Sequence, residues 1–362
     1  MRLLICAGGT GGGVYPALAV LQAGNNNTDI ETLWIGSNDG IEAELVTRAG
    51  IEFRGISAAG LHGVNVFSIP KRLYKLIKGY FEAGKIIREF KPDVMFFTGG
   101  YVGFPVAMAG RKVPSVLFVP DIEPGVALNM LGKNADVITV VCEDSEKYFS
   151  GSGRIEITGY PTRTDIRQWK KSDALDHFGL SGNEPVLFVF GGSKGARSIN
   201  NALKNNLSEL LQLCRIIHIT GKTDWDEMLH FYNELGEEDR KRYKIFPYLY
   251  EDMGAAFSAA DLVISRAGAS TLGEFPLFGI PAILVPYPYA WRYQKVNADY
   301  LVSKNAAQMI RDEDLSSQMV PAVSDLLHSP EKLDAMRNSM KKLARPDAAL
   351  SILDILRKAA EK

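Results

Sequence analysis

The sequence predicts an α/β protein made of two doubly wound parallel sheets, and three observations support this prediction. Short apolar runs typical of buried strands alternate with helical segments over the first 160 residues. After Gly159-Tyr160-Pro161 the same alternation begins again. Glycine-rich loops follow strands in both halves, and ligands of doubly wound sheets bind at the carboxyl ends of the strands.

The bulk composition fits two domains better than one. A chain of 362 residues is too long for a single ordinary core. Its formal charge of −1 gives no electrostatic case for binding nucleic acid. The three cysteines and five scattered histidines form neither a Cys-x-x-Cys pair nor a metal-ligand pattern. No apolar run approaches the length of a membrane span, so we expect a cytoplasmic protein whose membrane contact is peripheral.

The first half contains seven expected strands, and the first of them runs into a loop of unusual composition. The strands cover residues 2–5, 31–36, 51–56, 92–97, 115–119, 137–141 and 155–157. The loop Gly8-Gly9-Thr10-Gly11-Gly12-Gly13 separates the first strand from a helix with Pro16 in its first turn. This arrangement directs backbone N–H groups and a helix N-terminus toward an anion. We interpret it as an anion site, and a strand-to-helix turn without a ligand is the alternative.

This loop matches neither of two common nucleotide-binding patterns. No Gly-Lys-Ser/Thr follows it, which excludes a Walker A loop. It also lacks a clean Gly-x-Gly-x-x-Gly with an acidic residue at the end of the second strand, which argues against an ordinary dinucleotide site.

Residues 69–91 form a basic amphipathic segment. Seven basic residues face two acidic ones, and an apolar side is formed by Leu73, Leu76, Ile77, Tyr80 and Phe81. Such a helix on a neutral protein is a candidate for binding a membrane surface. The alternative is a surface helix whose apolar side faces the core while its lysines face water.

The second half repeats the architecture of the first. Its expected strands cover residues 186–190, 216–221, 245–246, 261–265 and 281–286. A final amphipathic helix over 347–358 could cross back to brace the first domain. The predicted domains are therefore residues 1–160 with the C-terminal segment 345–362, and residues 161–344.

Two loops of the second half suit a nucleotide diphosphate. In Gly191 to Asn200, and again in Gly268-Ala269-Ser270-Thr271, small residues lead into a helix whose first N–H groups lack intrahelical partners. Glu274 lies one turn into the second helix, where a carboxylate could accept hydrogen bonds from a ribose diol. The alternative for Glu274 is an ordinary first-turn glutamate stabilised by the helix dipole.

These motifs and several others resemble the MurG family of glycosyltransferases over nearly the whole chain. The matching stretches are Gly8 to Gly12 with Pro16, Gly99-Gly100-Tyr101 with Pro105, Gly159 to Arg163, Gly191 to Arg197, Glu251-Asp252-Met253, Arg266 to Thr271 with Glu274, and Gln294 with Asn297-Ala298. The resemblance implies the glycosyltransferase-B fold, in which two Rossmann-like domains face a cleft. It also implies inverting transfer of N-acetylglucosamine from UDP-N-acetylglucosamine to a polyprenyl-diphosphate acceptor, lipid I, at the inner face of the cell membrane, without a metal or other cofactor.

The resemblance also implies roles for individual residues. Contacts to the donor are expected from Arg163, Ser193, Tyr250, Ala269, Ser270, Thr271, Glu274 and Gln294. Contacts to the acceptor diphosphate are expected from Thr10, Gly11, Gly12, Gly13, Gly100 and Tyr101. Tyr293 stands where the family usually has His or Gln, which leaves the identity of the sugar open.

The acceptor side departs from the family at two places. Gly13 stands where the family has a loop histidine, and Phe118-Val119-Pro120-Asp121 replaces the family's His-Glu-Gln-Asn. Asp121 and Glu123 are therefore the candidates for the base that takes the proton of the attacking hydroxyl. The alternative is that both are solvated loop residues. Two other functions stay open, namely transfer to a different lipid or soluble acceptor, and nucleotide-sugar binding without catalysis.

Overall fold

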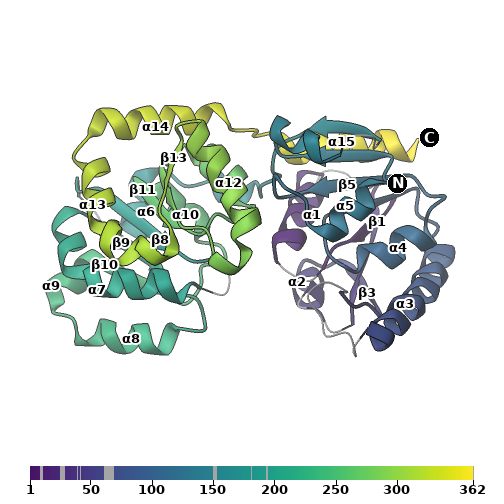
Figure 1. Ribbon diagram of the computed structural model, residues 1–362, viewed down its shortest axis with the longest axis horizontal. Coiled ribbons are helices and arrows are strands. Elements are labelled where there is room, and N and C mark those ends of the chain that lie inside the picture. Colours follow the sequence, from purple (N-terminus) through teal and green to yellow (C-terminus); the bar gives the residue numbers. More distant parts are fainter. Residues whose placement is uncertain are drawn as a thin grey trace. The chain divides into compact units, whose positions relative to one another are not determined.

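The chain folds into two compact units that are each built on one parallel sheet (Figure 1). The computed structural model describes residues 1–8, 11–24, 29–38, 40, 42–60, 69–149, 153–180, 182–192 and 195–361. Unit 1 comprises Met1–Thr164 with Arg345–Lys362, and unit 2 comprises Asp165–Ala344. The first crossing between the units thus follows Thr164, whereas the sequence placed it after residue 160.

The strands of unit 1 reverse their order at one point in the sheet. The order is β3-β2-β1-β4-β5-β6-β7, with every neighbouring pair parallel. The strands are β1 (Arg2–Cys6), β2 (Glu31–Ser37), β3 (Glu52–Ile56), β4 (Val94–Phe97), β5 (Ser115–Val119), β6 (Val137–Val140) and β7 (Arg154–Ile157). From β1 the chain proceeds outward in one direction, and from β4 in the other, so the loops after β1 and β4 border a crevice at the carboxyl edge.

Helices cover the sheet of unit 1, and the last helix of the chain is one of them. They are α1 (Gly11–Ala23), α2 (Glu42–Arg48), α3 (Ile69–Phe90), α4 (Gly103–Ala109), α5 (Val126–Gly132), η2 (Glu143–Tyr148) and α15 (Ala348–Ala360). The apolar residues Ile352, Leu353, Leu356 and Ala359 of α15 are buried with helical spacing. This helix packs against α1, β4 and β5 (Figure 1), so the expected return of the chain to the first domain occurs.

Unit 2 repeats this plan with the strand order β10-β9-β8-β11-β12-β13. Its strands are β8 (Val186–Phe190), β9 (Arg215–Ile219), β10 (Tyr243–Phe246), β11 (Leu262–Ser265), β12 (Ala282–Leu284) and β13 (Ala307–Met309). The order reverses between β8 and β11. The sequence does not predict β13, because its three residues, Ala-Gln-Met, have little strand propensity, and the strand forms through pairing with β12.

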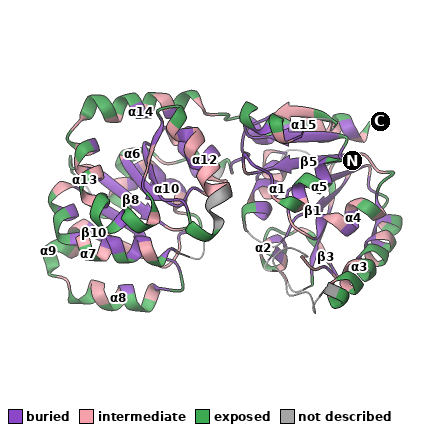
Figure 2. Ribbon diagram, in the orientation of Figure 1, coloured by how far each residue is buried: buried purple, intermediate pink, exposed green. Residues whose placement is uncertain are grey.

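The helices of unit 2 lie on the two faces of its sheet. They are η3 (Asp165–Arg167), α6 (Lys171–His177), α7 (Arg197–Leu213), α8 (Trp225–Glu234), α9 (Glu237–Arg242), α10 (Met253–Ala259), α11 (Thr271–Phe278), η4 (Pro288–Ala290), α12 (Trp291–Ser303), η5 (Asp312–Asp314), α13 (Leu315–Leu327) and α14 (Pro330–Lys342). Figure 2 shows the central strands buried beneath helices that expose their outer faces, which explains why these strands are apolar without alternation.

Aspartates anchor the amino edges of both sheets. Asp93, Asp136 and Asp261 each stand one residue before a strand. Their carboxylates accept the backbone N–H of the first residue of the neighbouring strand, at 2.6 Å from Arg2, 2.8 Å from Ser115 and 3.0 Å from Val186. The repeated contact fixes strand register at the amino edge, and leaves the carboxyl edge for the glycine loops.

No helix in the described part of the chain combines the length and apolar character needed to cross a bilayer.

A buried histidine links β9 to its neighbours in unit 2. His218 is 0% exposed, and its Nε2 lies 2.9 Å from Asn200 Oδ1 while its Nδ1 lies 2.8 Å from the Tyr243 hydroxyl. Since the amide oxygen only accepts, Nε2–H donates to it and Nδ1 accepts the tyrosine proton. The ring is therefore neutral, and burial lowers the pKa of His218 to about 3.

We predict that this histidine makes the fold sensitive to acid. The unfolded chain binds a proton at His218 below pH 6.5, whereas the folded chain does so only below about pH 3, so the free energy of unfolding falls as pH falls through this window. The expected slope from this residue is up to about 1.4 kcal/mol per pH unit. Urea denaturation of wild type and His218→Gln between pH 7 and pH 4 measures it. The variant should show the flatter dependence, and identical slopes would contradict the assignment.

Candidate functional site

The loops after β1 and β4 contact each other at the carboxyl edge of unit 1. Gly100 has φ of 83°, and a β-carbon there would lie 2.5 Å from the carbonyl oxygen of Gly8. The hydroxyl of Thr98, which is fully buried, donates a hydrogen bond to the Gly13 carbonyl. The structure thus brings together the two glycine loops for which the sequence predicted a common ligand.

The first turn of α1 supplies the glycines predicted to meet a diphosphate. Gly11, Gly12 and Gly13 open this helix, where backbone N–H groups have no intrahelical acceptor. Thr10 lies outside the described residues. A β-carbon at Gly13 would lie 3.3 Å from the Thr98 carbonyl oxygen, so a side chain there would require that carbonyl to move by a few tenths of an ångström. Tyr101 follows Gly100 and is half-buried, packed near Gly60.

The loop after β5 carries the two candidate carboxylates. β5 neighbours β4, so this loop emerges next to the second glycine loop. Phe118 and Val119 are fully buried in β5, and the Phe118 ring packs edge-on against Tyr160 at 5.8 Å. Asp121 is half-buried, and Glu123 is only 6% exposed. The alternative of a solvated loop residue therefore does not describe Glu123.

In unit 2 the loop after β8 is held by close backbone contact. Gly195 has φ of 80°, and a β-carbon there would lie 2.3 Å from the Thr220 carbonyl oxygen. That carbonyl accepts a hydrogen bond from Asn200 Nδ2 at 2.8 Å, and the same amide donates to Asp224 at 2.9 Å. Asp224 in turn pairs with Arg197 at the start of α7. Ser193, predicted to contact the donor, and its neighbour Lys194 lie outside the described residues.

The loop after β11 delivers three predicted residues to the start of α11. Ala269 and Ser270 are half-buried, and Ser270 makes no side-chain capping bond to the helix. Thr271 is 2% exposed, and its hydroxyl donates to the Gly268 carbonyl at 2.7 Å. Glu274 is half-buried, and its N–H donates to the Ser270 carbonyl at 2.8 Å. Because this loop and the loop after β8 border the point where strand order reverses, both face one crevice.

Three other predicted donor contacts come from separate segments. Arg163 lies near the end of the first stretch of unit 1, just before the chain enters unit 2. Tyr250 is 49% exposed, stands edge-on to Tyr248 at 4.5 Å, and has Lys222 Nζ 5.9 Å from its ring centre. Gln294 lies in the first turns of α12, where its Oε1 accepts the Tyr287 N–H at 2.8 Å.

The sequence did not point to two buried side chains that organise these loops. Thr98 follows β4, and Arg266 follows β11 with 8% exposure and contacts to several loops. Both stand immediately after a strand that borders a strand-order reversal. This position could have identified both residues from the sequence, because a polar residue directly after such a strand lies at the edge of the sheet where ligands bind.

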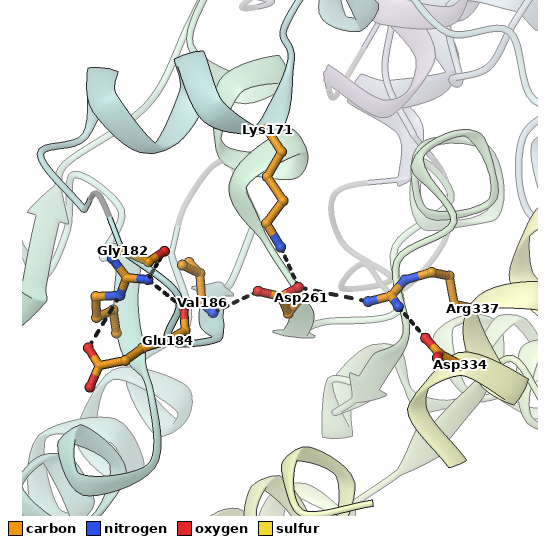
Figure 3. Close-up of polar contacts among 8 residues, drawn as sticks. Lys171, Gly182, Glu184, Val186, Asp261, Asp334 and Arg337 are labelled. Atoms are coloured by element: carbon orange, nitrogen blue, oxygen red, sulfur yellow. Dashed lines mark hydrogen bonds and ion pairs between the residues drawn. The ribbon is translucent and has the colours of Figure 1, made fainter. Parts of the chain in front are cut away.

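Two cavities lie away from these loops. One of about 640 Å³ in unit 2 is lined by residues that include Lys171, Asp261 and Arg337 (Figure 3), and one of about 430 Å³ in unit 1 includes Asp136. Both lie at the amino edges of their sheets, opposite the edge where doubly wound sheets bind ligands. In the described part of the chain, no group of three or more His, Cys, Asp or Glu side chains is placed to hold a metal.

Comparison with known proteins places this geometry in a family. The model of the glycosyltransferase family 28 N-terminal domain matches residues 3–129, and that of the C-terminal domain matches residues 186–352. A protein of Desulforamulus reducens is 39% identical, over 99% of this chain and 98% of the relative. Its name is UDP-N-acetylglucosamine--N-acetylmuramyl-(pentapeptide) pyrophosphoryl-undecaprenol N-acetylglucosamine transferase.

Solved structures agree on the fold. The crystal structure of Acinetobacter baumannii MurG matches with a TM-score of 0.77 and 26% identity over 99% of both chains. A UDP-GlcNAc 2-epimerase from Neisseria meningitidis, solved bound to UDP-GlcNAc, matches with a TM-score of 0.69 and 14% identity over 99% of this chain and 100% of that chain. At that identity the second likeness concerns the fold alone, and it shows that one fold supports different reactions.

We predict that Gly100→Ala destabilises the protein more than Gly50→Ala. Both glycines have positive φ, at 83° and 73°, so alanine at either position costs about 1 kcal/mol in backbone strain. Nothing lies within 4 Å of a β-carbon at Gly50, whereas one at Gly100 meets the Gly8 carbonyl. Denaturation should therefore show a loss of about 1 kcal/mol for Gly50→Ala and about 3 kcal/mol for Gly100→Ala. Equal losses would argue against the close approach of the two loops.

Proposed function

The chain belongs to glycosyltransferase family 28 and, within it, to the MurG family, and from this premise we propose that it transfers N-acetylglucosamine from UDP-N-acetylglucosamine to undecaprenyl-diphospho-muramoyl-pentapeptide, lipid I. One observation carries the proposal. Each unit has glycine loops and a helix N-terminus at the point where its strand order reverses. The proposed reaction has two diphosphate substrates, and a chain with one anion site per unit can hold both.

Unit 2 is the proposed donor side. The start of α11 would meet the diphosphate through the N–H and hydroxyl of Ser270, whereas the Thr271 N–H and hydroxyl both donate to the Gly268 carbonyl and hold the loop. The helix dipole stabilises the charge that grows on UDP as it leaves. Glu274 would accept the ribose hydroxyls, and Tyr250 would lie at the uracil. Arg163 and Ser193 would contact the nucleotide. Gln294, whose oxygen is occupied by the Tyr287 N–H, would present its amide N–H to sugar hydroxyls.

Unit 1 is the proposed acceptor side. The first turn of α1 and the Gly100 loop would hold the diphosphate of the lipid-linked acceptor through backbone N–H groups. Its sugar hydroxyl attacks the anomeric carbon, the bond to UDP breaks, and configuration inverts. A carboxylate of the neighbouring loop, Asp121 or Glu123, would take the hydroxyl proton. The glycines Gly11, Gly12 and Gly13 contribute backbone groups only, so they can bind phosphate but cannot accept this proton.

The enzyme assay tests the proposal directly. Purified protein with UDP-N-acetylglucosamine and lipid I should release UDP, and omission of lipid I should abolish release. We propose that no metal or other cofactor takes part, because helix N-termini can carry the diphosphate charge, so excess EDTA should leave the rate unchanged. Release with another lipid acceptor only would favour a different glycosyl acceptor. Binding of the donor without release in any acceptor mixture would favour a catalytically inactive homologue.

Two variants in this assay identify the base. Removal of a general base lowers the rate by about 10² to 10⁴-fold, so one of Asp121→Asn and Glu123→Gln should lose turnover to that extent. UDP affinity should be retained, because neither residue is among those assigned to the donor. Full activity in both variants would exclude both carboxylates as the base.

We propose further that α3 binds the membrane surface. Its exposed residues include Leu73 (50%), Tyr74 (67%), Ile77 (51%) and Phe81 (67%), which lie on one face by helical spacing. The buried residues of α3 are the small Gly79 and Ala83 and, near the C-terminal end of the helix, Ile86 and Ile87. The core therefore does not cover the apolar face formed by the exposed residues. Met108, Val126 and Met130 on the following helices are also exposed. Lysines flank the face, and we propose a peripheral position at the inner surface of the cell membrane.

Vesicle binding tests this assignment. The double variant Ile77→Ser/Phe81→Ser should bind vesicles of anionic phospholipid about 10-fold or more weakly, because each side chain loses about 1 kcal/mol of burial in the lipid interface. Its thermal stability should be unchanged, since both residues are exposed. Leu350→Ser is the matched control, because Leu350 is 47% exposed on α15 of the same unit. Equal binding by the double variant and the control would contradict the assignment.

A further inference from the structure

A buried arginine joins four segments at the carboxyl edge of unit 2. Arg266, which follows β11, donates from Nη1 to the Val285 carbonyl at 3.1 Å and from Nη2 to the Ser198 hydroxyl at 2.7 Å. Nη1 also forms an ion pair with Asp312, and the Ser198 hydroxyl donates to Asp312 at 2.7 Å. The guanidinium carbon lies 5.2 Å from the ring centre of Tyr287.

These contacts tie together the segments that follow β8, β11, β12 and β13. The Arg266 side chain is 8% exposed and that of Asp312 is 19% exposed, so both charges are largely removed from water. Loss of one partner from such a pair leaves the other charge uncompensated, and the surrounding loops must rearrange to solvate it. Arg266 and Asp312 therefore determine where the four segments lie relative to one another.

Two of the joined segments carry residues assigned above to different parts of the donor. The segment after β11 leads to Ser270, assigned to the diphosphate, and the segment after β12 leads to Gln294, assigned to the sugar. Tyr287 connects these two segments, because its ring packs against the Arg266 guanidinium and its N–H donates to Gln294 Oε1 at 2.8 Å. A second tie runs from Asn297 Nδ2, on the same helix as Gln294, to the Ala267 carbonyl at 3.1 Å.

We propose that Arg266 and Asp312, bridged by Ser198, are positioning residues that set the distance from the diphosphate loop to Gln294 and so determine which sugar the enzyme accepts. The inference rests on the proposed function, since it takes the donor to be a UDP-sugar. In this scheme neither the Arg266 side chain nor the Asp312 side chain contacts the donor. The pair acts through the orientation of the Gln294 amide, whose N–H groups would donate to the sugar hydroxyls.

The test compares Asp312→Asn with wild type, using UDP, UDP-N-acetylglucosamine and UDP-N-acetylgalactosamine. UDP has no sugar, so its affinity should fall by a clearly smaller factor than that of UDP-N-acetylglucosamine. The kcat/KM for UDP-N-acetylglucosamine should fall by about 100-fold, the typical effect of displacing a contact by about 1 Å. Its preference over UDP-N-acetylgalactosamine, which differs only in the orientation of one hydroxyl, should fall by about 10-fold or more.

Asp261→Asn is the matched control. Asp261 stands at the opposite end of β11, its side chain is 17% exposed, and it pairs with Lys171 and Arg337 while accepting the Val186 N–H (Figure 3). The substitution removes the same charge from the same sheet at its amino edge. It should lower thermal stability without changing the preference between the two sugars.

Ser198→Ala provides a milder second variant that removes only the bridging hydroxyl. It should keep the fold and shift sugar preference in the same direction as Asp312→Asn, by a smaller factor. If both variants alter UDP and UDP-sugar affinity equally, or alter only stability as the control does, the pair is structural and the proposal is overturned. If wild-type protein binds UDP but neither UDP-sugar, the proposed function fails first and the inference falls with it.

Discussion

Close contact between backbone segments at the carboxyl edge of each sheet is the constraint on which both sites depend. In unit 1 the Gly100 backbone lies against the Gly8 carbonyl, and in unit 2 the Gly195 backbone lies against the Thr220 carbonyl. Each approach is too close for a β-carbon, and each requires a positive φ that glycine adopts without strain. Because no side chains separate these loops, the N–H groups of the following helices can face a ligand directly.

The amino edge and the carboxyl edge of each sheet have different structural roles. At the amino edge, an aspartate before the strand holds the first N–H of its neighbour, as Asp93, Asp136 and Asp261 do. At the carboxyl edge of unit 1, the Thr98 hydroxyl donates to a backbone carbonyl. At the carboxyl edge of unit 2, Arg266 is the centre of a charged cluster. Anchoring at one edge sets the register of the strands, so the other edge can be composed of irregular backbone whose groups bind substrate.

The departures from the family's acceptor motifs have a physical basis in unit 1. Phe118 and Val119 are core residues of β5, and Phe118 packs on Tyr160, so the positions contribute packing in this chain. A β-carbon at Gly13 would lie 3.3 Å from the Thr98 carbonyl oxygen, a tight contact that the carbonyl must yield to by a few tenths of an ångström. Asp121 and Glu123 are the acidic side chains at the start of the loop after β5, which emerges beside the Gly100 loop.

The sequence by itself determined the strands of both sheets except β13, the place of the glycine loops and the residues that carry the family resemblance. Apolar runs and glycines report on burial and backbone freedom, and these are local properties. Tertiary structure alone decided which loops meet, since Gly8 and Gly100 are brought together by the pairing of β1 with β4. It also decided that the apolar face of α3 is exposed, because periodicity gives a face without saying what covers it. The cluster of Arg266, Asp312 and Ser198 joins residues that are far apart in the chain, and only the folded sheet places their charges and hydroxyl within hydrogen-bond distance.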